Sequence, residues 1–156
     1  MKWVDGTEID VRDLSGEDIC EKLAIEMYDT DSDQWMLCDE CIRNALYIID
    51  FDTETNMEGF STPYLGNFSA DYYAKIKNAF RTIGDDKDAD LIEEALRLDS
   101  DYTKRLDNAD NDEESDRIYN EFREKLGVLE ERLYLNTDFD MWSLLYKYLD
   151  ERIKEL

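Results

Sequence analysis

The side chains most able to do chemistry in this sequence are its 41 aspartates and glutamates, which outnumber 18 lysines and arginines and give a net charge of -23. Histidine is absent. Its absence removes Ser–His and Cys–His nucleophile pairs, histidine metal ligands and the commonest general base. Carboxylate pairs suited to glycoside chemistry must occur by chance among so many acids, so they indicate nothing. We expect a protein that is not an enzyme and uses no cofactor.

The acids occur in blocks. Residues 1–60 hold 17 acids and 4 bases, 61–84 hold 1 and 3, 85–127 hold 16 and 7, and 128–156 hold 7 and 4. Carboxylates four residues apart on a helix approach the spacing of phosphates along a strand, roughly 6–7 Å. The candidate partner-binding residues are Asp29, Asp31, Asp33, Asp39, Glu40, Asp50, Asp52, Glu54 and Glu58 in the first block, and Asp110, Asp112, Glu113, Glu114 and Asp116 in the second.

This charge repels nucleic acid and anionic membranes and steers the protein toward basic surfaces. The expected partner is a basic DNA-binding regulator or a nuclease, with no direct nucleic-acid or membrane contact. For any single carboxylate, the competing interpretation is a solvated acid at a helix N-terminus, where acids complement the helix dipole. For the whole set we favour function, because like charges at this density cost stability that a basic partner would restore.

A partial calcium-binding motif overlaps the first block. The stretch D-T-D-S-D-Q-W-M-L-C-D-E places acids at EF-hand loop positions 1, 3, 5 and 12, namely Asp29, Asp31, Asp33 and Glu40. Position 6 is Gln34, where the tight turn requires glycine, position 9 is Leu37, and no second loop pairs with it. Because of these mismatches, we keep calcium binding through these four acids only as the alternative function. A third interpretation is an acidic helical adaptor.

The three cysteines include a C-x-x-C pair, Cys38 and Cys41, with Cys20 as the third. Structural zinc needs four ligands, and a redox motif needs a preceding strand, so neither is indicated. Two thiols at i and i+3 on an amphipathic helix act as small buried hydrophobes. We expect free thiols in a reducing cytoplasm.

The elements that position these residues follow from apolar spacing. Helices are predicted from Ser15 to about Tyr28, from Asp33 to Asp50, from Ser69 to Ile83, and from the acids at 85–90 to about Asp101. A further helix is predicted through Ile118 to Leu126, with Gly127 interrupting or bending it before Leu129. The last predicted helix begins at Asp138 or Asp140 and continues through Ile153. Polar residues 102–114 predict a long exposed connection. No period-2 alternation and no signal or membrane-spanning run is present. The prediction is one all-α domain over 1–156 with about six or seven helices, located in the cytoplasm.

A compact turn is predicted between Asn56 and Pro63, because Asn and Gly tolerate the positive φ that ends a helix and Pro63 keeps Thr62 out of the helical region. Phe60 and Tyr64 bring apolar area to this turn and are expected to pack inward. We interpret the polar and aromatic residues around it as a structural corner, with a pocket as the alternative. These residues are Asn56, Phe60, Tyr64 and Asn67.

The same turn carries a family resemblance. The pattern N-x-x-G-F-x-x-x-Y-x-x-N, formed by Asn56, Gly59, Phe60, Tyr64 and Asn67 and followed by a helix ending A-F-R-T-I-G, is similar to the signature of the DNA mimic protein 19 family. The segment L-E-E-R-L-Y-L-N-T-D-F-D-M-W-S-L-L-Y-K-Y-L resembles that family's closing segment, so the likeness covers about residues 35–149. Where the family has Asn-Gly-Gly-Phe, this chain has Met57 and Glu58 between Asn56 and Gly59.

The resemblance implies an all-helical, non-enzymatic and often dimeric protein. Its carboxylates would imitate the phosphates of duplex DNA and occupy the DNA-binding face of a partner such as a transcription regulator. Together with the charge, this predicts an inhibitor or immunity protein directed against a nucleic-acid-binding protein. The resemblance also allows this chain to form a homodimer.

Overall fold

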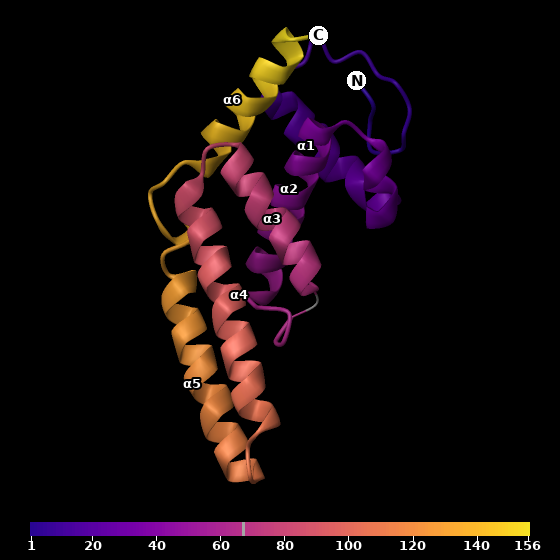
Figure 1. The fold of residues 1–156 in the computed structure, drawn as a ribbon. Helices are drawn as coiled ribbons and strands as arrows, with labels where there is room; N and C mark the ends of the chain where they lie inside the picture. The colour runs from indigo at the N-terminus through magenta and orange to yellow at the C-terminus, as the bar shows by residue number, and fades with distance from the viewer. Residues whose placement is uncertain (67) are drawn as a thin grey trace.

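The computed structural model describes residues 1–66 and 68–156, and helices dominate it (Figure 1). The elements are α1 (Gly16–Glu26), η1 (Met27–Asp29), η2 (Ser32–Leu37), α2 (Glu40–Glu58), α3 (Ala70–Thr82), α4 (Asp86–Asp107), α5 (Asp112–Glu130), η3 (Tyr134–Asn136) and α6 (Met141–Lys154), where η marks a 3-10 helix. In the described ranges, the only β pairing is an isolated bridge between Lys2 and Glu8. The all-α prediction is confirmed.

The main core forms around α2, which packs against α1, α3 and α6. Ile42, Leu46, Ile48 and Phe51 of α2 are fully buried. Helix α1 also lies against α6, and there a Cβ on Gly16 would come within 2.2 Å of the Tyr146 carbonyl oxygen. The absence of a side chain at Gly16 therefore permits the close approach of these two helices.

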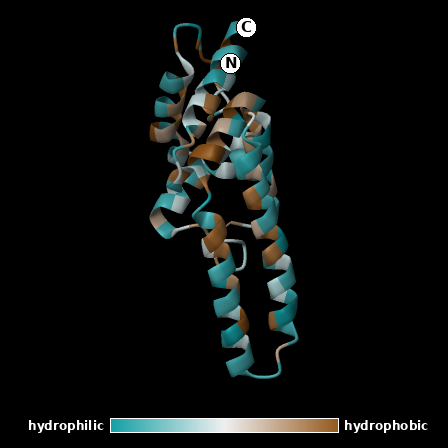
Figure 2. Cartoon of the chain, turned by 90° about the vertical axis from the view of Figure 1, so that its left-hand side faces the viewer, coloured by the Kyte–Doolittle hydropathy of each residue, from teal (hydrophilic) through white to brown (hydrophobic). Residues whose placement is uncertain are grey.

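Helices α4 and α5 form a long antiparallel hairpin that extends away from the main core (Figure 1). Near its end it has a small core of its own, in which Tyr102, Ile118 and Phe122 are buried and the rings of Tyr102 and Phe122 stack at 5.3 Å. Both helices are largely hydrophilic in Figure 2, with hydrophobic residues at intervals along each. The hairpin thus exposes most of its polar surface.

This hairpin corrects two predictions. The expected exposed connection over 102–114 is wrong, because α4 continues to Asp107 and only residues 108–111 connect it to α5. The Asp- and Asn-rich composition predicted a loop, but burial of Tyr102 against Phe122 favours the helix. Gly127 does not interrupt α5, which continues to Glu130.

Three predicted capping residues are found at helix starts. Ser15 and Asp18 form a complete capping box on α1, and Ser69 and Asp140 cap α3 and α6 through their side chains. Gly59, with φ 82°, ends α2, so the turn expected between Asn56 and Pro63 is confirmed.

The helix predicted from Asp33 to Asp50 is displaced. Residues Ser32–Leu37 form η2 instead, and α2 runs from Glu40 to Glu58. Cys38 and Asp39 between them are extended, with φ -81° and ψ 166° at Cys38 and φ -62° and ψ 150° at Asp39. The Asp39 side chain does not cap α2, because it accepts a hydrogen bond from the Lys2 backbone N–H at 2.7 Å.

Candidate partner-binding surface

Residues 23–74 form a stretch with eleven acids and a single base, Arg43. Within it, Asp29, Asp31 and Asp33 are exposed and form no ion pair with any other described residue. Asp29 ends η1, Asp31 precedes η2 and Asp33 lies in it, with Thr30 and Asp31 in extended conformation. An extended chain advances about 3.3 Å per residue, so alternate residues lie roughly 6–7 Å apart. The extended backbone at Thr30 gives Asp29 and Asp31 roughly this separation along the chain, whereas Asp33 lies in the 3-10 helix η2.

Exposed apolar side chains flank these aspartates. Tyr28, Met36 and Leu37 are 57%, 58% and 60% exposed. Leu37 falls within the helix predicted from Asp33 to Asp50, where we expected its side chain on the buried face; that expectation is wrong, because this part of the chain forms η2 with three residues per turn. At that period Trp35 and Cys38 share the buried side, and the two residues between them point outward. We call Tyr28, Asp29, Asp31, Asp33, Met36 and Leu37 together the acidic–apolar face.

Trp35 anchors this face from beneath. Its side chain is 2% exposed, its indole N–H donates to the Thr30 hydroxyl at 3.3 Å, and its ring lies 6.2 Å from that of Tyr47 on α2. The acidic–apolar face is therefore attached to the main core at its centre.

Two other candidate carboxylates serve the fold. Asp50 accepts hydrogen bonds from the hydroxyls of Tyr28 at 2.9 Å and Tyr72 at 2.5 Å, and Asp52 accepts one from Tyr134 at 2.6 Å. Burial, followed by the neighbouring carboxylate, raises the pKa of both Tyr72 and Tyr134, so both hydroxyls remain donors. Burial also raises the pKa of Asp52, and the Tyr134 hydroxyl opposes that shift. Nothing in the sequence distinguishes these two acids from their exposed neighbours.

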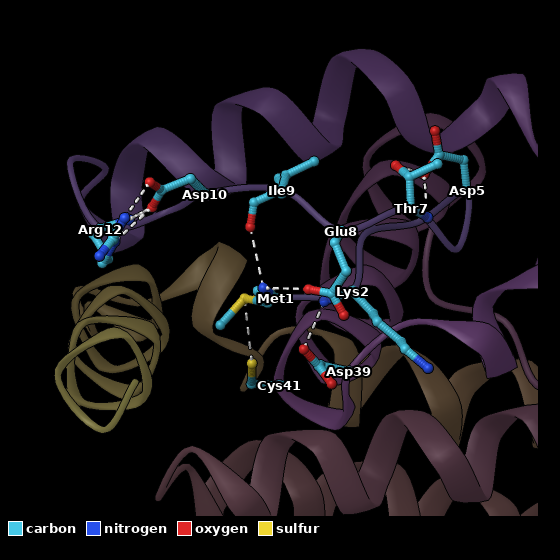
Figure 3. A network of polar contacts seen from close by, with 10 residues as sticks. All are labelled: Met1, Lys2, Asp5, Thr7, Glu8, Ile9, Asp10, Arg12, Asp39 and Cys41. Atoms are coloured by element: carbon cyan, nitrogen blue, oxygen red, sulfur yellow. Dashed lines mark hydrogen bonds and ion pairs between the residues drawn. The ribbon is translucent and has the colours of Figure 1, made fainter.

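Asp39 connects the N-terminal segment to the start of α2 (Figure 3). Beside it, the Met1 amino group donates to the Glu8 carboxylate at 2.9 Å and to the Ile9 carbonyl oxygen at 3.1 Å. Asp39 is half-buried, whereas the next candidate, Glu40, is exposed. Asp39 thus has an internal role, and Glu40 presents its charge to solvent.

The remaining first-block candidates lie on α2. Glu54 is half-buried and Glu58 is exposed. Glu58 borders a cavity of about 270 Å³ between the Pro63 corner and α5, which also includes Phe60, Arg123 and Glu130. The structure therefore places the first-block acids in several different environments.

The second acidic block lies at the end of the hairpin. Asp110, Asp112, Glu113 and Asp116 are exposed, while Glu114 is half-buried and accepts a hydrogen bond from the Asp110 backbone N–H at 3.1 Å. Most of these acids occupy the first turns of α5, where they complement the positive end of the helix dipole. A neighbouring cavity of about 300 Å³ includes Lys104, Arg105 and Arg117. Bases therefore lie close to this block.

Four acids in the first half of α4, namely Asp86, Asp90, Glu93 and Glu94, are ion-paired. Arg81 of α3 contacts Asp86 at 3.4 Å, Asp90 at 2.8 Å and Glu93 at 3.1 Å. These carboxylates carry their own counter-charge, unlike those of the acidic–apolar face.

Two acids at the corner between α3 and α4 are buried. Asp85 is 1% exposed and accepts a hydrogen bond from the Asp88 backbone N–H at 3.1 Å. Asp88 is 0% exposed and accepts one from the Tyr134 backbone N–H at 3.0 Å. Burial, and next the adjacent Asp85, raises the pKa of Asp88 to about 8. The sequence predicted acids at this helix start, but nothing in it indicated that two of them are buried.

The EF-hand alternative finds no assembled site. No group of three or more His, Cys, Asp or Glu side chains able to hold a metal ion occurs among the described residues. Of the proposed ligands, Asp29 lies in η1, Asp33 in η2 and Glu40 in α2, and Asp31 lies in the extended segment before η2. The 3-10 helix at Ser32–Leu37 replaces the glycine-centred turn that an EF-hand loop requires.

All three cysteines are free and buried, as predicted. Cys38 and Cys41 do not share one helix as expected, because Cys38 follows η2 and Cys41 lies in the first turn of α2. The Cys38 thiol donates to the Trp35 carbonyl oxygen at 2.8 Å. Burial raises the pKa of Cys20 to about 12 and that of Cys38 to about 11, so these thiols are poor nucleophiles.

The corner around Pro63 is closed mainly by packing. Phe60 is buried edge-on against Phe51 at 6.0 Å, and its backbone N–H donates to the Glu130 carboxylate at 3.2 Å. Tyr64 is 47% exposed, so the expectation that it packs inward is only partly met. Asn56 donates to the Asp52 carbonyl oxygen within α2, and Asn67 lies outside the described residues.

These features define an acidic, all-helical protein with a net charge of -23. A family model described as DMP19-like protein matches residues 37–152, and the chain belongs to this family. No curated protein and no solved structure matches the chain. Within the described parts of the chain, no helix has the length and apolar content needed to cross a membrane.

Proposed function

We propose that this protein is a non-enzymatic inhibitor that competes with nucleic acid for the basic face of a partner protein, either a DNA-binding regulator or a nuclease. The acidic–apolar face is the contact surface. The observation that supports this most is the pairing of three exposed aspartates, for which the described residues provide no ion pair, with the exposed side chains of Tyr28, Met36 and Leu37. The cytoplasm is the compartment in which three free thiols persist.

The two components of this face have separate tasks. The aspartates and the net charge of -23 accelerate encounter with a basic surface, and this acceleration decreases as salt increases. The tyrosine, methionine and leucine supply the apolar area that gives an interface its energy and its choice of partner. A surface that served solubility alone would gain nothing from exposing them.

Family membership supports the general strategy. The DMP19-like match and the signature at Asn56 to Tyr64 favour a DNA-mimicking scaffold. The match begins at Leu37, so nearly all of the acidic–apolar face precedes the matched residues. In this proposal, the matched residues 37–152 supply the helical scaffold of the family, and the segment before them determines which partner is bound.

The second acidic block is a weaker candidate for the contact surface. Its acids complement the start of α5, and the adjacent cavity includes Lys104, Arg105 and Arg117. Those bases lower the local negative potential that a basic partner would sense. This block therefore provides a control with similar exposure.

The test begins with affinity capture from the source cell's lysate at low and high salt, followed by mass spectrometry. The expected result is a basic nucleic-acid-binding protein that salt releases. Its association rate with the purified protein is then measured for the triple variant Asp29→Asn, Asp31→Asn, Asp33→Asn and for the control Asp112→Asn, Glu113→Gln, Asp116→Asn. Both variants lose three charges.

We expect the first variant to slow association at low salt by about tenfold or more, and the control to change it by less than about threefold. Equal effects of the two variants would show that net charge alone, and not the acidic–apolar face, directs binding. Recovery of no basic protein would contradict the proposed function itself.

A further inference from the structure

An open cavity of about 280 Å³ lies where α1, α2 and α6 meet. Its walls include Cys20 and Glu21 of α1, Asp52 and Thr53 of α2, and Trp142 and Tyr146 of α6. The volume falls just below the about 300–1,000 Å³ of pockets that enclose drug-sized ligands. It therefore suits a single long side chain better than a large ligand.

The chemistry of the walls is that of a cation site. Two carboxylates, Glu21 and Asp52, lie with two aromatic rings, Trp142 and Tyr146, and no lysine or arginine lines the cavity. Four other surface cavities in the described residues each include at least one arginine. Aromatic faces and carboxylates both attract guanidinium and ammonium groups.

Local electrostatics support this assignment. Asp52 is half-buried, and burial raises its pKa, so a nearby cation would relieve the cost of its charge. The pKa of Tyr146 is raised first by burial and then by Cys20, Glu17 and Glu21. The cavity thus lies in a region of negative potential that the chain does not neutralise with a base of its own.

The cavity also lies close to Tyr28 of the acidic–apolar face, because Thr53 of its wall is among the groups that interact with the Tyr28 hydroxyl. The Tyr28 hydroxyl donates to Asp50 at 2.9 Å. Thr53, one turn further along α2 than Asp50, is part of the cavity wall. A partner that covers Tyr28 can therefore extend a side chain toward Asp52.

We propose that this cavity binds one arginine side chain of the basic partner, with its guanidinium stacked on Trp142 or Tyr146 and paired with Asp52 and Glu21. This inference rests on the proposed function, because it names the anchor of the same interface. Arginine fits better than lysine because its planar, weakly hydrated guanidinium both stacks on rings and forms bidentate pairs with carboxylates.

The cavity can be tested without the partner. Trp3 and Trp35 are each 2% exposed, whereas Trp142 is half-exposed, so its indole N–H signal in NMR reports on the cavity. The probe is n-propylguanidinium, and the neutral control is n-propylurea, which has nearly the same shape. The Trp142→Phe variant assigns the signal.

We expect the guanidinium probe to shift the Trp142 signal saturably and the urea to leave it unchanged. The variant Glu21→Gln, Asp52→Asn should weaken the probe by about three- to tenfold, while Asp112→Asn, Glu113→Gln at the hairpin end should not. Asn at position 52 still accepts the Tyr134 hydrogen bond, and circular dichroism checks that the fold is kept. No shift with the guanidinium, or equal shifts with both probes, would overturn the proposal.

The partner then distinguishes this inference from the function on which it rests. The Glu21→Gln, Asp52→Asn variant should increase the dissociation rate of the complex by about tenfold or more, because a buried arginine anchor is lost. If a basic partner dissociates from this variant at the same rate as from the unmodified protein, the arginine-binding proposal is wrong, but the proposed function is not contradicted. Absence of any basic partner overturns both. A Trp142 signal that shifts with protein concentration alone assigns the cavity to a second copy of the chain and also overturns the anchor.

Discussion

Replacing Asp88 with Asn tests the buried carboxyl pair between α3 and α4. Asp88 and Asp85 are 0% and 1% exposed, and the Oδ2 atom of each has no hydrogen-bond partner among the described residues. With its pKa raised to about 8 by burial and by Asp85, Asp88 holds a proton at neutral pH that it can donate to Asp85. An asparagine amide would replace that donor permanently and still accept the hydrogen bond from the Tyr134 backbone N–H.

The pH dependence follows from the direction of the shift. Folding raises the pKa of Asp88 from 3.8 to about 8, so between these values the folded chain binds more protons than the unfolded chain. The contribution of this group to stability is therefore complete at low pH and decreases as pH rises toward 8. One proton corresponds to at most about 1.4 kcal/mol per pH unit, or roughly 2–3 kcal/mol between pH 5 and pH 7.

We expect the stability of the Asp88→Asn variant, relative to the unmodified protein, to increase by roughly 2–3 kcal/mol between pH 5 and pH 7. For a protein of this size, that is a change of about 5–10 °C in Tm. Urea unfolding followed by circular dichroism at several pH values measures the difference, and the repulsion among surface acids cancels because it is common to both proteins. The control Asp88→Ala removes the acceptor for Tyr134 and should cost about 1–3 kcal/mol at pH 5. Parallel pH profiles for the Asn variant and the unmodified protein would refute the proton-binding role of Asp88.

Further predictions concern packing, a buried hydrogen bond and the thiols. Gly16→Ala places a Cβ 2.2 Å from the Tyr146 carbonyl oxygen and should lower the free energy of unfolding by about 1–3 kcal/mol. Gly127→Ala has open space around its Cβ inside α5 and should raise the free energy of unfolding by about 0.5–1 kcal/mol. Urea unfolding measures both changes, and changes of the same sign would contradict the close packing of α1 on α6. Tyr134→Phe removes the hydroxyl that donates to Asp52 and should lower the free energy of unfolding by about 1–2 kcal/mol. The loss of this donor should also raise the pKa of Asp52 further, which an NMR titration measures. An unchanged pKa of Asp52 would refute the contact. The three buried thiols should not react with a thiol reagent at pH 8 until denaturant is added, and immediate modification of the native protein would contradict their burial.

The sequence predicted the fold class because helical periodicity and capping residues act locally. Ser15 and Ser69 cap helices through contacts only three residues away, so their role is visible in the sequence. Gly59 ends α2 because a positive φ suits glycine, another local property. These signals required no knowledge of tertiary structure.

The errors arose where tertiary contacts decide the local structure. Helix α4 continues past Asp101 because Tyr102 is buried against Phe122 on the other arm of the hairpin, a contact that composition cannot show. Residues Ser32–Leu37 form a 3-10 helix in which Trp35 points to the core. Six residues make about two turns of either helix, and apolar spacing over so short a stretch does not decide between period 3.0 and period 3.6.

The sequence predicted which segments are rich in acidic residues, but not which of these residues form an exposed surface. The sequence identified the acidic blocks, but the division between Asp50, which accepts two tyrosine hydroxyls, and Asp31, which faces solvent, depends on residues far away in the chain. The exposed Tyr28 and Met36 were missed because both fall within predicted helices, and the sequence does not show that their side chains point to solvent.

The central claim is that this protein and nucleic acid occupy the same face of the partner. The most direct measurement mixes the captured partner with the protein at fixed concentration and titrates duplex DNA, with analytical ultracentrifugation to resolve each complex. We expect only two binary complexes, with the DNA displacing the protein and the midpoint of displacement moving with protein concentration as competition requires. A ternary complex of partner, protein and DNA would contradict the claim.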